Sequence, residues 1–162
     1  MNSTLKKELE SIFEDIQIVI PKNNRLTIIA PKDTVLNILS FLKDKGYDHL
    51  ELISCVDWIE AKEFELVYII TSYGEEIIII LKTRIPRNLP QFITAIPVFE
   101  NVEAYEREIH ELFGINFEGH PRLIPLFLER EYKIPPFRKD FDTRKYVEEV
   151  FDKIPFVEDK KK

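Results

Sequence analysis

The first hundred residues carry two stretches in which apolar positions recur with the spacing of a helix. Between Leu5 and Ile16 they lie on one stripe, with lysines and glutamates between them. A second such stretch begins after Asp33, a suitable N-cap, and ends before Gly46, which suits the left-handed position after a helix. The pattern therefore predicts two amphipathic helices, one at the start of the chain and one over residues 34–45.

Strand-like runs occupy most of the sequence between and after these helices. The last three of them, residues 50–56, 64–72 and 76–83, are rich in Ile, Val and Tyr and contain little charge, which predicts that most of their positions face packed layers. The runs are residues 18–20, 26–30, 50–56, 64–72 and 76–83. Together with a last helix over residues 101–113, they predict an α+β fold: a mixed or antiparallel sheet of about four to five strands, with helices on one face.

The character of the chain changes near Pro86. Eight of the ten prolines lie from that residue onward, and residues 118–162 carry five prolines and five phenylalanines without clear periodicity. Prolines remove backbone donors and restrict helix formation, while the phenylalanines carry apolar area that needs a surface. We therefore expect an α+β domain over residues 1–114, followed by an extended Pro-rich C-terminal arm over residues 115–162 that binds a partner. The alternative is that this arm folds back onto the sheet of its own chain.

Composition narrows the possible functions. The chain has 162 residues, 44% hydrophobic and 32% charged, with a net charge of −6, which argues against a nucleic-acid partner. A single cysteine, Cys55, excludes an intramolecular disulfide and any four-thiolate metal site, and its apolar run predicts a buried, inert thiol. The longest apolar run, residues 77–81, is too short to cross a bilayer, and the polar N-terminus shows no signal peptide. We expect contact with a membrane only through a partner.

One candidate for catalysis is the run His-Glu-Leu-Phe-Gly at residues 110–114. It begins like the zinc-protease helix, but Gly114 occupies the position of the second histidine. Neither His49 nor His120 has a spacing that repairs this. A free-standing metal-dependent hydrolase that uses His110, Glu111 and His120 is therefore kept as the alternative function.

The charged residues of the last predicted helix also allow two interpretations. Glu106, Glu108 and Glu111 around Arg107 could be acid–base groups. However, Glu103–Arg107 and Arg107–Glu111 are i,i+4 pairs that are typical of a solvated helix. Composition alone favours a charged surface helix.

A multi-part pattern covers about residues 98–142. It consists of Glu-Arg-Glu at 106–108, Phe-Gly-Ile at 113–115, Gly-His-Pro-Arg-Leu at 119–123 and Pro-Phe-Arg-Lys-Asp at 136–140. These pieces, in this order, resemble the signature of the 30-kDa subunit of respiratory complex I. The same family includes equivalent subunits of membrane-bound hydrogenases and of similar archaeal complexes.

Several positions depart from the usual pattern of that family. Glu111 stands where aspartate is usual, Ala104 where many members carry an aromatic residue, and Phe137 where leucine is expected. Ile124 and Pro125 replace a basic pair that is common in quinone-linked complex I. These departures favour a hydrogenase-type or archaeal-type complex over an ordinary NADH-fed one.

The resemblance implies a non-catalytic structural or assembly subunit of the soluble arm of a complex I-like (NADH:quinone oxidoreductase-type) or membrane-bound hydrogenase-like electron-transfer complex. It implies no cofactor in this chain, and a cytoplasmic position at the peripheral face of the cell membrane. Expected partners are the catalytic 49-kDa or hydrogenase-large-type subunit and the cluster-bearing small subunits. The residues it assigns to the partner interface are Glu106, Arg107, Glu108, Phe113, Gly114, His120, Pro121, Arg138, Lys139 and Asp140.

Overall fold

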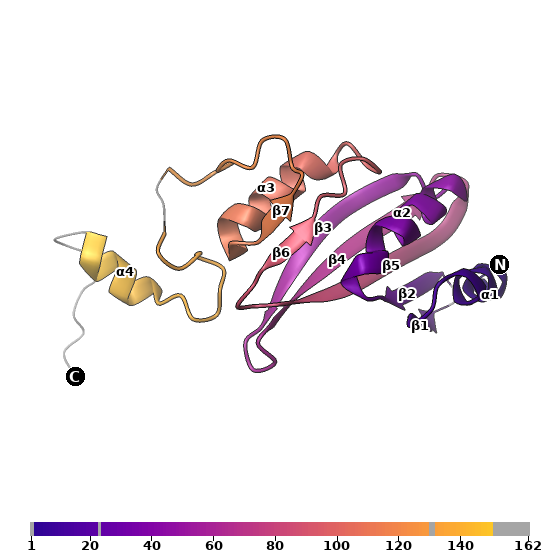
Figure 1. The fold of residues 1–162 in the computed structure, drawn as a ribbon, viewed down its shortest axis with the longest axis horizontal. Coiled ribbons are helices and arrows are strands. Elements are labelled where there is room, and N and C mark those ends of the chain that lie inside the picture. Colours follow the sequence, from indigo (N-terminus) through magenta and orange to yellow (C-terminus); the bar gives the residue numbers. More distant parts are fainter. Residues whose placement is uncertain (1, 23, 130–131, 151–162) are drawn as a thin grey trace.

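The computed structural model describes residues 2–22, 24–129 and 132–150 (Figure 1). The helices in chain order are α1 (Asn2–Ile12), the short 3₁₀ helix η1 (Lys32–Thr34), α2 (Val35–Asp44), α3 (Val102–Phe113) and α4 (Thr143–Val150). The strands are β1 (Gln17–Lys22), β2 (Arg25–Ile29), β3 (His49–Trp58), β4 (Glu63–Ser72), β5 (Glu75–Pro86), β6 (Gln91–Ile93) and β7 (Asn116–Glu118).

Five strands form the main sheet, in the order β1-β2-β5-β4-β3. Neighbouring strands are antiparallel except β2 and β5, which run parallel. A parallel pair needs a crossover, and α2, β3 and β4 lie between β2 and β5 in the chain. The sequence prediction of an α+β fold with a mixed sheet of four to five strands is confirmed.

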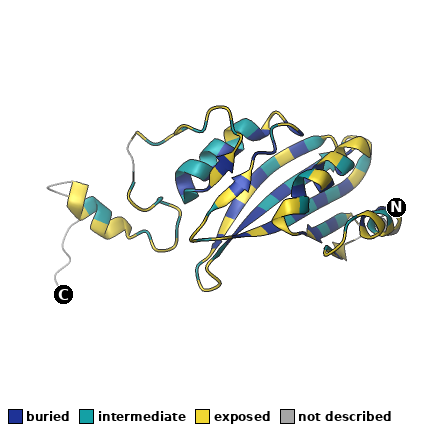
Figure 2. Ribbon diagram, in the orientation of Figure 1, coloured by how far each residue is buried: buried dark blue, intermediate teal, exposed yellow. Residues whose placement is uncertain are grey.

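One face of this sheet holds the hydrophobic core. In β4, Phe64, Leu66, Tyr68 and Ile70 are buried at alternate positions, as the two-residue period of a strand requires. Helix α2 covers this face, and its fully buried residues are Val35, Ile38, Leu39 and Leu42. Figure 2 shows the resulting bands of buried and exposed residues along the strands.

Two aromatic contacts place α3 and β6 on the same face as this core. Phe113 of α3 meets Phe64 edge-on at 6.1 Å between ring centroids, and Phe92 of β6 lies 6.5 Å from Tyr68. Both sheet residues belong to the buried side of β4. The helices that pack on the sheet thus gather on one face, as the sequence predicted.

The opposite face of the sheet has no comparable cover. Ile69 and Ile80 pair across β4 and β5 and are only half-buried, whereas Val19, Ile29 and Val56 are exposed. The prediction that most strand positions face packed layers is therefore wrong for this side. Low charge in a strand indicates apolar neighbours, but it does not require a helix on both faces.

The predicted ends of the helices also shift. α1 ends at Ile12 instead of Ile16, and Asp15 follows with a positive φ of 59°, outside the helical range. Asp33 lies in the 3₁₀ helix before α2, so Thr34 takes the N-cap position; its hydroxyl donates to Pro31 O at 2.9 Å and does not cap the helix. Gly46 has a φ of 90°, which agrees with the predicted left-handed stop.

The packed core continues past residue 114. β7 pairs in parallel with β6, and Ile115 and Phe117 are buried beside it. Beyond β7, within the described residues 119–129 and 132–142, the chain forms turns and bends without a helix or strand. We call residues 119–142 the C-terminal segment.

A helix that the sequence did not predict follows this segment. It is α4, whose residues are mostly exposed, and it lies at the end of the molecule opposite to α1 (Figure 1). None of the helices that the structure describes is long and apolar enough to span a bilayer. Phe151 and Phe156, two of the five phenylalanines in the predicted arm, lie outside the described residues.

Candidate functional site

Helix α3 is the element on which the C-terminal segment rests. Val102, Ile109 and Leu112 bury its apolar side, and the helix stops at Gly114, whose left-handed φ of 74° suits a residue without a Cβ. The predicted helix and its glycine stop are thus both present. Its polar side chains are then available to bind the backbone that follows.

The end of α3 receives donors from the C-terminal segment. The amide of Phe137 donates to the carbonyl of Leu112 at 3.0 Å, and Arg138 Nε donates to the carbonyl of Phe113 at 2.6 Å. The last carbonyls of a helix lack partners inside it, and they attract a cation. Phe137 and Arg138 therefore cap α3 from a distant part of the chain.

Gly114 is required by this close approach as well as by its backbone conformation. A Cβ at this position would lie 2.9 Å from Arg138 Nη2 and 2.9 Å from Pro135 Cγ. Real Cβ atoms do not approach other atoms so closely. The pattern residues Gly114 and Arg138 are thus direct neighbours, although they are far apart in the sequence.

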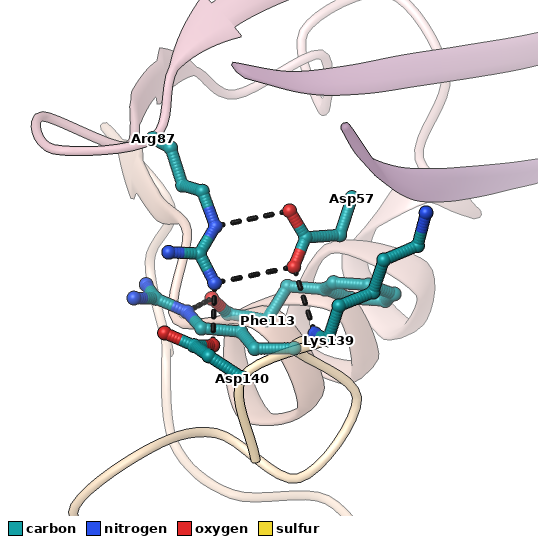
Figure 3. Close-up of polar contacts among 6 residues, drawn as sticks. Asp57, Arg87, Phe113, Lys139 and Asp140 are labelled. Atoms are coloured by element: carbon teal, nitrogen blue, oxygen red, sulfur yellow. Dashed lines mark hydrogen bonds and ion pairs between the residues drawn. The ribbon is translucent and has the colours of Figure 1, made fainter. Parts of the chain in front are cut away.

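Asp57, a buried carboxylate at the end of β3, holds Lys139 directly and Asp140 through Arg87 (Figure 3). Asp57 accepts hydrogen bonds from Arg87 Nε at 3.0 Å, from Arg87 Nη2 at 3.2 Å and from the Lys139 amide at 2.9 Å. Arg87 also bonds the carboxylate of Asp140. Arg87 lowers the pKa of Asp140, and hydrogen bonds from Arg87 to Asp57 and Asp140 raise the pKa of the guanidinium.

Sequence reasoning missed Asp57 and Arg87 as site residues. The available signal was an aspartate at the inner side of an apolar strand, since Asp57 alternates with the buried Ile53 and Cys55. A buried carboxylate requires partners, and its partner Arg87 lies 30 residues away. Nothing local in the sequence indicates that pairing.

Glu111 binds the C-terminal segment further along the helix. Its carboxylate accepts the consecutive amides of Leu126, Phe127 and Leu128, the first two at 3.1 and 2.9 Å. Burial would raise the pKa of Glu111, but these amides favour the charged form and lower it overall. Three amides on one carboxylate fix the path of the backbone.

Arg107 holds the neighbouring stretch through its carbonyls. Its Nε donates to Ile124 O and its Nη2 to Pro125 O, both at 3.0 Å, while Glu103 lies 3.5 Å away as an ion pair. The planar guanidinium suits two acceptors in one plane. We call the contacts that join the C-terminal segment to the rest of the chain the clasp: Arg107, Glu111 and Asp57 bind backbone groups of the segment, and Arg138 of the segment binds the end of α3.

The two histidines of the hydrolase alternative, His110 and His120, form hydrogen bonds with backbone atoms. His110 Nδ1 lies 2.8 Å from Ile115 O, and His120 Nε2 lies 3.1 Å from Glu103 O. His120 Nδ1 accepts the amide of Arg122. In the described part of the chain, no group of three His, Cys, Asp or Glu side chains is arranged to hold a metal ion. The structure therefore does not gather the residues of the hydrolase alternative into a site.

Glu106 departs from the prediction of a surface helix. It is fully buried, and its carboxylate accepts Thr94 Oγ1 at 2.6 Å and the amide of Ala95 at 2.8 Å. Burial raises its pKa to about 7, against the lowering effect of those two donors. The interpretation of this glutamate as part of a solvated face is wrong, because it turns toward β6.

The side chains of Glu108, Pro121 and Lys139, all assigned to the partner interface from the sequence, lie at the surface. Glu108 is half-buried and makes no hydrogen bond or ion pair within the described residues. Pro121 is exposed, and the Lys139 ammonium lies 6.0 Å above the exposed ring of Trp58. Cys55, by contrast, is buried as predicted, and desolvation raises the pKa of its thiol well above the ordinary value.

Comparisons with known proteins show the family of the chain. Residues 28–147 match the family model described as the respiratory-chain NADH dehydrogenase 30 kDa subunit, so the chain belongs to that family. It is 38% identical over 120 residues to the C subunit of the F(420)H(2) dehydrogenase of Methanosarcina mazei, which covers 73% of this chain and 76% of the relative. It is 34% identical over 152 residues to the C subunit of the NADH-quinone oxidoreductase of Bartonella tribocorum, covering 91% and 73%.

Two solved structures share the fold. A chain of the membrane-bound sulfane sulfur reductase, an archaeal respiratory membrane complex, aligns with a TM-score of 0.85 at 28% identity, over 99% of this chain and 96% of that one. A trypsin-resistant fragment of Nqo5 aligns with a TM-score of 0.65 at 22% identity, over 76% of this chain and all of the fragment. The family resemblance seen in the sequence is thus confirmed.

Proposed function

We propose that this chain is a non-catalytic scaffold subunit of a complex I-like electron-transfer complex, and that the C-terminal segment is its partner-binding surface. Family membership supports a place in such a complex. One structural observation carries the scaffold role: the clasp fixes the backbone of the segment while large apolar side chains on it stay exposed. A fixed backbone reduces the entropy lost on binding.

The exposed side chains are Phe127 and Phe137, at 66% and 61% of their full accessibility. The amide of Phe127 is bound by Glu111 and the amide of Phe137 by Leu112 O, so both rings start from fixed positions. Buried aromatic residues dominate the affinity of many interfaces. These two rings are the anchors that a neighbouring subunit would cover.

The clasp divides the pattern residues into two roles. Arg107 and Arg138 donate hydrogen bonds to backbone carbonyls of this chain. Glu108 and the Lys139 ammonium make no ion pair within the described residues and are available to a partner. The interface assignment from the family pattern thus becomes a proposal for Glu108 and Lys139 above all, with the arginines acting by holding the segment in place.

The proposed partners are the catalytic large subunit and the cluster-bearing small subunits of the complex, at the cytoplasmic, peripheral face of the membrane. The archaeal relatives support a hydrogenase-type or archaeal-type complex over an ordinary NADH-fed one. The predicted division after residue 114 is proposed in a narrower form: the clasp holds the C-terminal segment on α3 in the free chain, and a partner covers its exposed rings. Limited proteolysis tests it: cleavage should begin in the C-terminal segment of the free chain and should be blocked in the assembled complex.

Co-purification with the other subunits tests the interface. Phe127→Ala combined with Phe137→Ala should weaken binding by a factor of ten or more, because each buried ring contributes about 1.5–3 kcal/mol. Tyr73→Ala is the matched control. Tyr73 is 87% exposed and follows β4 at the end of the sheet opposite to Trp58. Equal recovery of partners with the double variant and the control would contradict the proposal.

Two single variants, Glu108→Ala and Arg138→Ala, distinguish an effect on assembly from an effect on the stability of the chain. Glu108→Ala should weaken assembly without changing the free energy of unfolding of the isolated chain. Arg138→Ala should lower both, because it removes the cap of α3. If Glu108→Ala leaves assembly unchanged at moderate salt, this residue has no interface role.

A further inference from the structure

The carboxyl group of Glu106 lies inside the protein and takes no part in the clasp. Its two hydrogen-bond donors, the Thr94 hydroxyl and the Ala95 amide, are both uncharged, and both belong to buried residues. Thr94 Oγ1 in turn accepts the amide of Ile96 at 3.3 Å. A single carboxylate is thus enclosed between α3 and the stretch after β6 without a countercharge.

The charged residues nearest in sequence on α3 do not provide that countercharge. Arg107 is occupied by Ile124 O, Pro125 O and Glu103, and His110 Nδ1 by Ile115 O. Glu103 would repel a carboxylate. No ion pair joins Glu106 to any residue that the structure describes.

The elements packed around Glu106 offer no cation either. β6 and residues 94–98 contain no charged side chain, and the nearby charge on β7, Glu118, is exposed and negative. Lys43 of α2 donates to Val98 O instead.

Strand β3, which packs against α3, carries the carboxylates of Glu51 and Asp57, and its His49 lies 3.6 Å from Glu51. From β4, Tyr68 faces the site: its phenol is fully buried, has no hydrogen-bond partner among the described residues, and has its pKa raised by burial and by the charge of Glu106.

We propose that Glu106 is an internal proton-binding site, and that its proton occupancy sets the stability of the layer formed by α3, β6 and β7. A protonated carboxyl keeps its hydrogen bonds to Thr94 and Ala95 and removes an unpaired charge from the interior. The folded chain therefore binds this proton more tightly than the unfolded chain does. This site is independent of the proposed scaffold function.

The direction of the effect follows from linkage. Burial raises the pKa of Glu106 to about 7 in the folded chain, whereas an unfolded glutamate titrates near 4.3. The stabilisation is complete below the unfolded pKa and is lost as the pH rises through the folded one. The pH window is therefore about 4.3 to 7, within which the layer is weakened as the solution becomes neutral.

The layer connects this site to the C-terminal segment. The Thr94 amide donates to Glu118 O, and the Asn116 amide donates to Pro90 O, so β6 and β7 are tied together next to Glu106. The segment begins at residue 119, directly after β7. A change in the hydrogen bond between Thr94 and Glu106 therefore affects β7, the strand from which the C-terminal segment begins.

The side-chain carboxyl ¹³C signal of Glu106 in the full chain, assigned by through-bond correlation, tests the proposal directly. Its titration midpoint is expected near 7, well above that of an unfolded glutamate, about 4.3. Glu108→Gln is the control and should leave that midpoint in place. A Glu106 midpoint below 5 would overturn the proposal, and this measurement needs no Glu106 variant.

Thermal unfolding supplies the second measurement. Glu106→Gln is a neutral isostere of the protonated form, so its unfolding midpoint should exceed that of the wild type by several degrees at pH 8 and by clearly less at pH 5, closer to the unfolded pKa of about 4.3. Glu108→Gln should follow the wild type at both values. A difference between Glu106→Gln and wild type that is the same at pH 5 and pH 8 would count against a proton site.

Discussion

The sheet with α2 and the clasp on α3 are stabilised in different ways. The sheet buries Ile, Leu, Phe and Tyr side chains at regular alternate positions, so its stability comes from apolar burial that has no preferred direction. The clasp consists of directional hydrogen bonds between charged side chains and particular backbone atoms: Arg138 donates to Phe113 O, and Glu111 accepts the amide of Phe127. Apolar burial tolerates gradual change in side-chain volume, whereas a lost directional bond leaves a specific group unpaired.

A core substitution in the sheet should produce the largest loss. Leu66 is fully buried in β4, between the main strands and the helices. Leu66→Ala should lower the free energy of unfolding by about 2–5 kcal/mol, because it removes apolar contacts and leaves a cavity. Chemical denaturation measures it, with Val19→Ala on the exposed face as the control. A loss below about 1 kcal/mol would contradict the position of the core.

The carboxylate at the end of β3 should give the largest effect within the clasp. Asp57→Ala removes both hydrogen bonds that Arg87 makes to it and the acceptor for the Lys139 amide. Breaking a buried ion pair costs about 3–5 kcal/mol, and Arg87 is partly solvated, so about 3 kcal/mol is expected. Asp140→Ala, whose side chain is 41% exposed, should cost clearly less in the same denaturation experiment. Equal losses of unfolding free energy in the two variants would mean that burial does not determine the strength of the ion pairs with Arg87.

The glycine that ends α3 sharpens the comparison, because its effect depends on both regions. Gly114→Ala should destabilise the chain by about 1–2 kcal/mol from its left-handed backbone alone. The contact of the new Cβ with Arg138 should add to this. In the background Arg138→Ala, the added part should disappear. A double-mutant cycle measures the coupling, and complete additivity would show that the two residues do not touch.

The carboxylate of Glu111 should show an acid-dependent effect. Hydrogen bonds to charged groups contribute about 1.5–3 kcal/mol, and Glu111→Gln should lose about 1.5 kcal/mol at pH 7. Because amides lower its folded pKa, the contribution of Glu111 is present above the unfolded pKa and is lost as the pH falls through the folded one. The wild type and Glu111→Gln should therefore converge in stability below about pH 4. Denaturation across pH 3–7 checks this, and a constant difference would contradict it.

The smallest effect is expected in α4. Arg144 is 87% exposed and pairs with Glu148 one helical turn away. Arg144→Ala should change the free energy of unfolding by less than about 0.5 kcal/mol, since exposed i,i+4 pairs are weak and screened by salt. Denaturation in low and high salt measures this. A loss above 1 kcal/mol would indicate that α4 packs more firmly than its exposure indicates.

Much of the architecture could be predicted from the sequence, because it depends on neighbouring residues. Runs rich in Ile, Val and Tyr predicted the strands β3, β4 and β5, and the helical period predicted α2 and α3. Gly46 and Gly114 marked helix ends through their backbone conformation. The multi-part pattern from Glu106 onward indicated the family before any contact was known.

The contacts of the site could not be predicted in this way. Asp57 and Lys139 meet across 82 residues, and the pairing depends on how β3 ends beside the returning chain. The charged pattern of α3 likewise gave no sign that Glu106 faces inward and Glu108 outward. These two residues have the same chemistry and lie two positions apart, so only the orientation of the helix separates their roles.

The sequence by itself thus determined the elements, their stops and the family, since each follows from local periodicity or from a residue type at a fixed spacing. Tertiary structure alone decided which face of the sheet is covered, which charges bind the backbone of this chain and which remain at the surface. The physical reason is that burial and hydrogen-bond partners depend on elements that pack together from distant parts of the chain. For Arg138 that partner is a helix end 25 residues earlier.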